Sequence, residues 1–153
     1  MFRRTLLCTT ALVPAIALVG CQAQTASQIA SDVKLIASGL TAAMADIKLL
    51  PGVPGAAVTQ LDFYLATIQA GAAKVASATS VSTASTVQEI AQVVQAIASV
   101  ALPLVPAGSV IEAAIQAALS LLPAILAAVG VAGASVRTKY QPAQARAILA
   151  ALR

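Results

Sequence analysis

The chain has 153 residues, which is the size of one ordinary domain. Hydrophobic residues make up 59% of it, charged residues 9% and aromatic residues 3%, and the net charge is +4. This composition excludes intrinsic disorder, which requires low hydrophobicity and high charge. It also argues against a nucleic-acid-binding protein, because the charge is small, Lys and Arg do not cluster, and few aromatic rings could stack on bases. The chain has no histidine, so the commonest general base and metal ligand is missing.

Residues 1–20 have the pattern of an export signal. Arg3 and Arg4 supply a basic start, residues 6–19 form an apolar run, and the small Gly20 follows. The run is shorter than the roughly 20 apolar residues that a membrane-spanning helix needs. We therefore expect residues 1–20 to be a signal peptide that is removed on export. The strong apolar run favours the general export route over the twin-arginine route.

The end of this signal, Leu18-Val19-Gly20-Cys21, resembles the lipobox of bacterial lipoproteins. In that motif an aliphatic residue, a small or aliphatic residue, and Gly or Ala precede an obligatory Cys. The resemblance covers only the signal and its junction. It implies cleavage between Gly20 and Cys21, a diacylglyceryl group on the Cys21 sulfur, and a further acyl chain, such as palmitate, on the new amine. The alternative is cleavage after Ala23 by an ordinary signal peptidase.

A lipid on Cys21 would hold the protein on a membrane without a transmembrane helix. Two or more acyl chains anchor stably, at about 0.8 kcal/mol for each buried methylene. Residues 21–25 would then be a lipidated tether. In this family an Asp after the Cys is the usual signal for inner-membrane retention, so Gln22 implies the outer membrane, facing the periplasm. Because Cys8 leaves with the signal and Cys21 is acylated, we expect no disulfide, thiol nucleophile or cysteine metal site.

Residues 26–136 predict an Ala-rich, all-α, four-helix up-and-down bundle made of two helical hairpins. Apolar residues recur there at alternating steps of three and four, the spacing of helices that pack along a seam. We expect helices over residues 26–50, 56–76, 87–101 and 110–131. The predicted seams are Ile29, Val33, Ile36, Leu40, Ala43, Ile47 and Leu50 in the first helix, Val58, Leu61, Leu65, Ile68, Ala72 and Val75 in the second, and Val87, Ile90, Val94, Ile97 and Ala101 in the third.

Proline and glycine mark two of the breaks between these helices. Residues 50–55 and 102–108 both contain a Leu-Pro pair followed by a Val-Pro pair, which predicts turns and suggests a duplicated hairpin. The Ser-, Thr- and Ala-rich residues 77–85 predict a loop. Capping boxes are predicted for Thr25 with Gln28, for Thr86 with Glu89, and for Ser109 with Glu112.

The helix expected over residues 110–131 differs from the others, because residues 113–136 carry no charge and apolar side chains lie all round it. Such a helix is buried either in protein or in lipid. Its eight aliphatic residues favour membrane insertion by roughly 2.4–4.8 kcal/mol in total. Gln116, Ser120 and Pro123 oppose insertion, so we favour a central position in the bundle. We also expect Pro123 to kink the helix and to leave the Leu119 carbonyl unpaired.

Residues 137–153 form a basic tail with a charge of +4, against −2 for residues 21–136. Pro142 suits the first turn of a short amphipathic helix. Such a helix could lie on an anionic membrane or contact a partner. The simpler expectation is that it docks on the bundle with its arginines outward. The candidate contact residues are Arg137, Lys139, Tyr140, Arg146 and Arg153.

No motif in the chain nominates a catalytic or metal site. Asp32 and Asp46 fall about 21 Å apart along one helix, too far to act as an acid–base pair. Glu89 and Glu112 are explained as helix caps. We therefore expect no catalysis, no metal, no nucleic-acid partner, and no cofactor other than the covalent lipid on Cys21.

Three classes of function remain. The first is a structural or interaction lipoprotein of the bacterial cell envelope, which binds an envelope protein or a second copy of itself. The second is a pore- or holin-like protein whose residues 112–136 insert in the bilayer. The third is a carrier of an apolar ligand. The apolar seams favour the first class, because they predict helices that pack on one another.

Overall fold

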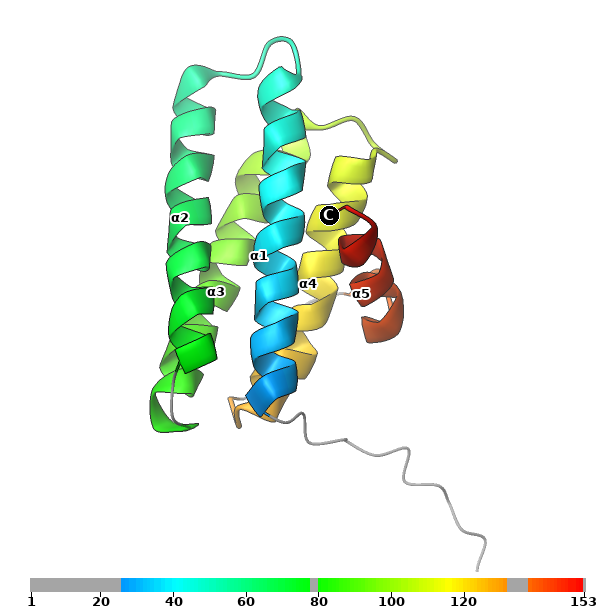
Figure 1. The fold of residues 1–153 in the computed structure, drawn as a ribbon. Helices are drawn as coiled ribbons and strands as arrows, with labels where there is room; N and C mark the ends of the chain where they lie inside the picture. Colours follow the sequence, from blue (N-terminus) through cyan, green and yellow to red (C-terminus); the bar gives the residue numbers. More distant parts are fainter. Residues whose placement is uncertain (1–25, 78–79, 132–137, 153) are drawn as a thin grey trace, which may run out of the picture.

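A computed structural model describes residues 26–77, 80–131 and 138–152, which form helices joined by turns (Figure 1). The all-α prediction is confirmed for this part of the chain. The elements are α1 (Ala26–Leu49), α2 (Gly55–Ser77), α3 (Ser80–Ala101), the 3-10 helix η1 (Leu102–Leu104), α4 (Val110–Ala128) and α5 (Pro142–Ala151). The predicted signal, lipobox and tether, with the Thr25 cap, lie outside the described residues, as do Arg137 and Arg153.

The helices pack together as a bundle. Helix α1 packs on α2, α2 on α3, α3 on α4, and α1 also packs on α4. The α1–α2 turn and the α3–α4 connection lie at the upper end in Figure 1, and α1 begins at the lower end. Helix α5 lies against α4 and α1 (Figure 1). Helix α1 is therefore covered by three other helices.

The predicted seams form the core of this bundle. Every predicted seam residue of α3 is buried, and so are those of α1 except the half-buried Leu50. Of the predicted seam residues of α2, Leu61, Ile68 and Val75 are buried, and Val58, Leu65 and Ala72 are half-buried. Helix α1 buries a wider face than a single seam, because α5 covers its second side. The additional buried residues of α1 are Asp32, Leu35, Ala37, Gly39 and Met44.

The predicted loop over residues 77–85 is wrong, because α3 already begins at Ser80. The predicted capping box of Thr86 with Glu89 is wrong for the same reason, since Thr86 lies inside the helix. Ser and Thr are weaker helix formers than Ala by at most about 0.7 kcal/mol each, which is a small penalty for a helix that packs on α2 and α4. Thr83 and Ala84, one turn before Val87, are half-buried and extend the apolar seam.

The start of α4 agrees only partly with the predicted capping box. Ser109 is the N-cap, and its hydroxyl accepts a hydrogen bond of 3.1 Å from the Glu112 amide, as expected. The Glu112 carboxylate, however, accepts from the amide of Gly108 rather than from that of Ser109. The carboxylate thus binds the amide one residue before the N-cap, and this bond still places a negative charge at the positive end of the helix.

Helix α4 ends at Ala128 and not at residue 131 as predicted. Gly130 has a φ of 75°, the left-handed conformation that glycine adopts without strain. Its amide donates to the Ala127 carbonyl at 3.1 Å, and the Val131 amide donates to the Leu126 carbonyl at 3.0 Å. These two bonds are the Schellman pattern, in which a left-handed residue closes a helix.

Helix α4 is one continuous helix that contains Pro123. The kink at this residue stays a prediction. Ile115, Leu121, Leu122 and Ile125 of this helix are among the most completely buried side chains. By length and composition alone, two segments of the described chain could cross a membrane, Thr83–Leu104 with a mean hydropathy of 1.3 and Val110–Ala128 with 1.9. In the bundle, 56% of the most apolar window of Val110–Ala128 is buried against the other helices.

Candidate functional site

The basic tail docks on the bundle, and its described residues use their polar groups there. Helix α5 begins at Pro142, in its first turn as predicted. Gln141 and Gln144 form a capping box at this end. This capping box was not predicted from the sequence. Ala145 and Leu149 are buried against the bundle, and Ile148 and Leu152 are half-buried.

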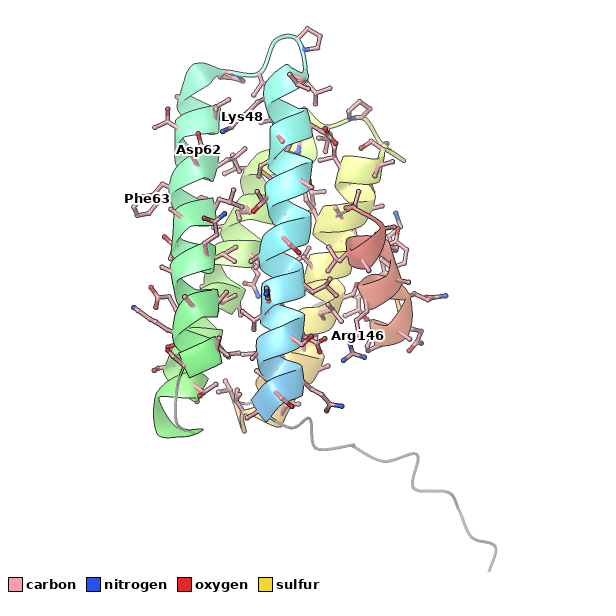
Figure 2. The ribbon with its side chains drawn as sticks, in the orientation of Figure 1. Lys48, Asp62, Phe63 and Arg146 are labelled. Atoms are coloured by element: carbon pink, nitrogen blue, oxygen red, sulfur yellow. The ribbon has the colours of Figure 1, made fainter. Side chains whose placement is uncertain are left out.

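Arg146 does not point outward, which corrects the expectation for this arginine. Its guanidinium lies between α5 and α1 (Figure 2) and binds the carboxylate of Asp32 with two hydrogen bonds. Nε donates to Oδ1 at 2.8 Å, and Nη2 donates to Oδ2 at 2.7 Å. The Asp32 hydrogen bond raises the pKa of Arg146 further above its usual range. Arg146 is therefore engaged with α1.

Asp32 was not predicted to be buried, although its spacing from the apolar seam of α1 indicates burial. It follows the seam residue Ile29 by three positions and precedes Ile36 by four, so it lies on the buried face of α1. Only 5% of its surface is exposed. A buried carboxylate requires hydrogen bonds and an opposite charge, and four basic residues stand in the tail.

Lys139 and Tyr140 hold the segment before α5 against α4. The Lys139 ammonium lies 3.3 Å from Glu112 Oε1 and 5.9 Å from the centre of the Tyr140 ring. The Tyr140 amide donates to the hydroxyl of Ser120 at 3.2 Å, and this hydroxyl donates to the Gln116 carbonyl at 2.7 Å. The bond from the Gly108 amide, followed by the bond and charge of Lys139, lowers the pKa of Glu112.

Two further surface features were not singled out from the sequence. Phe63 of α2 is 69% exposed and points away from the bundle (Figure 2). It borders a hollow of about 270 Å³ between α2 and α3, whose lining includes Gly71, Lys74 and Ile90. The signal for Phe63 was its position between the seam residues Leu61 and Leu65, which places a large aromatic ring off the buried stripe.

The acidic side chains that form ion pairs lie at separate places in the bundle. Asp62 pairs with Lys48 across α1 and α2, with 2.6 Å between Nζ and Oδ1 (Figure 2). Within the described residues, no three His, Cys, Asp or Glu side chains gather in a group that could hold a metal ion.

No protein-family model matches this chain, and no curated protein and no solved structure matches it either.

Proposed function

We propose that the protein is a lipid-anchored helical lipoprotein of the bacterial cell envelope with a structural or protein-binding role. The observation that carries this proposal is Leu18-Val19-Gly20-Cys21, placed directly after a basic start and an apolar run. Gln22 supports an address in the outer membrane, facing the periplasm. The membrane contact is then the lipid on Cys21, five residues before α1 begins.

We further propose that α1 to α4 form an up-and-down four-helix bundle of two hairpins, with α5 as a short addition. Packing of each long helix on its neighbours in the chain, and of α1 on α4, supports this arrangement. The two Pro/Gly breaks at the same end of the bundle support it as well (Figure 1). Short connections between antiparallel neighbours are the usual feature of such bundles.

A structural or binding role accounts for three of the five acids better than catalysis does. Asp32 joins α5 to α1, Asp62 pairs with Lys48, and Glu112 caps α4 and binds Lys139. Each of these carboxylates thus has a role in the fold.

Phe63 is the best candidate for direct contact with a partner. Exposed aromatic side chains beside a small hollow are the kind of anchor that protein interfaces bury. Cross-linking in intact cells, followed by identification of the partner, tests this role. Phe63→Ala should abolish the cross-linked product, and Leu49→Ala, at another exposed apolar residue that is 82% exposed, is the matched control.

The pore- or holin-like alternative draws support from the hydropathy of 1.9 over Val110–Ala128. Insertion of this helix would remove it from α1, α3 and α5, on all of which it packs. We therefore prefer the bundle. A chain carrying an ordinary export signal and Cys21→Ser should be released by carbonate extraction, and retention in the membrane would favour the alternative.

Lipidation itself is tested by growing producing cells with radiolabelled palmitate. The wild-type protein should take up label and Cys21→Ser should not. Cys8→Ser is the matched control, because Cys8 lies in the part of the chain that we expect to be removed; this variant should label like wild type. An unlabelled wild-type protein, or an intact Met1 in its mass spectrum, would contradict the proposal.

A further inference from the structure

A long apolar groove runs along the surface between α1 and the second half of α2. Its volume is about 810 Å³, within the range of roughly 300–1,000 Å³ that is usual for ligand sites. Alanine is its commonest lining residue, at Ala30, Ala37, Ala72, Ala73 and Ala76, and Ser, Thr, Gln and Lys side chains supply the rest of the lining. Small side chains on both helices leave a trough that larger residues would fill. Among the described residues that line it, Lys34 alone carries a charge.

The two ends of the groove differ. At one end, Gln69 Nε2 donates a hydrogen bond of 3.2 Å to Thr41 Oγ1, and this bond links α2 to α1 across the groove. The other end lies at Ser27 and Ala76, beside the first residue of α1. The span from Ser27 to Thr41 is about 21 Å along the helix axis. The groove is thus a largely apolar surface trough, and its end at Ser27 lies next to the N-terminus of α1.

An acyl chain suits this groove. It is thin, flexible and apolar, so it can lie along the alanine methyl groups while the Ser, Thr, Gln and Lys side chains at the rim keep contact with water. The groove is comparable in length with an extended palmitoyl chain. The third class of function expected from the sequence was a carrier of an apolar ligand, for which no binding residues were predicted. The groove between α1 and α2 is an apolar surface that could hold such a ligand.

The nearest source of an acyl chain is the protein's own anchor. Cys21 precedes Ala26 by five residues, which span at most about 17 Å when extended. A lipid on Cys21 can therefore reach the end of the groove at Ser27. Covalent attachment gives it a high effective concentration there, which a free lipid lacks. We propose that one acyl chain of the lipid on Cys21 lies in the groove between α1 and α2. This inference rests on the proposed lipidation.

The test uses the full chain, produced in bacteria that are fed a palmitate analogue with a photoreactive diazirine on its chain. After irradiation, the protein is purified and its cross-linked peptides are identified by mass spectrometry. Ala73→Phe fills the groove from an exposed position, and Ala45→Phe is the matched control, an exposed site on α1 away from the groove. Ala76→Phe serves as a second groove variant, and far-UV circular dichroism establishes that each variant is helical.

We expect cross-links within one molecule, from the Cys21 lipid to residues 27–41 and 69–76. They should be lost in both groove variants and retained in Ala45→Phe. Label that enters the protein but cross-links only to phospholipid, to a second copy or to other proteins would overturn the groove proposal and leave the lipidation proposal standing. Absence of label in the wild-type chain would overturn both.

Discussion

The guanidinium of Arg146 and the carboxylate of Asp32 meet through two parallel hydrogen bonds, although 114 residues separate them in the chain. The carboxylate is buried, whereas the arginine side chain is 40% exposed. Arginine suits this position because its planar fork matches both oxygens of a carboxylate. The pair ties α5 to α1.

Arg146→Ala should lower the free energy of unfolding by about 1–3 kcal/mol, because a buried carboxylate loses its two charged hydrogen bonds. Urea denaturation followed by circular dichroism measures this loss. Lys48→Ala is the control, since it removes an exposed pair with Asp62 that should contribute less than about 1 kcal/mol. Equal losses in the two variants would show that the Asp32 pair is no more than a surface contact.

Gly39→Ala should destabilise the protein by about 1–3 kcal/mol through overpacking. A Cβ at this position would lie 2.5 Å from Cδ2 of Leu149, on α5. Leu149→Ala removes the side chain that this Cβ would meet, so the two substitutions together should cost less than the sum of their separate losses, and a double-mutant cycle measures this coupling.

Gly55→Ala is the matched control for this variant, because no atom lies within 4 Å of a Cβ there. It should be neutral or should stabilise by up to about 1 kcal/mol. If Gly39→Ala behaved in the same way, α5 would not pack on α1 as described.

Stability should fall in acid through Glu112. Hydrogen bonds from Gly108 and Lys139 lower its folded-state pKa below the ordinary value of 4.5. The contribution is therefore complete above that value and is lost as the pH falls through the folded-state pKa. Thermal unfolding of wild type and Glu112→Gln across this range measures it. The difference between the two proteins should shrink with falling pH, and a constant difference would contradict the assignment.

Gly130→Ala should cost about 1–2 kcal/mol, because a Cβ is unfavourable in the left-handed conformation that closes α4. Gly130→Asn should cost less, since asparagine tolerates this conformation. Calorimetric melting of the three proteins ranks them. An Ala variant as stable as wild type would mean that the helix end does not depend on this turn.

The sequence predicted the helices well wherever apolar spacing was regular. The seam residues of α1 and α3 are buried because steps of three and four place them on one face. The helical residues 80–86 were missed because their Ser and Thr content suggested a loop, whereas the helix propensity of these residues is only slightly below that of Ala. The contact of Arg146 with Asp32 could not be predicted by periodicity, since spacing along one helix carries no information about a partner 114 residues away.

The position of α5 has a consequence for assembly. Its partner α1 is synthesised before it, and α2, α3 and α4 lie between the two in the chain. Contacts between distant segments close large loops and form slowly. Until α5 has been made, one side of α1 remains uncovered. Asp32, and the space beside Gly39 that Leu149 fills, are then open to water. A nascent chain therefore cannot complete the packing around α1 until α5 has also been synthesised, so the last side of α1 to be covered depends on the helix that is made after all the others described here.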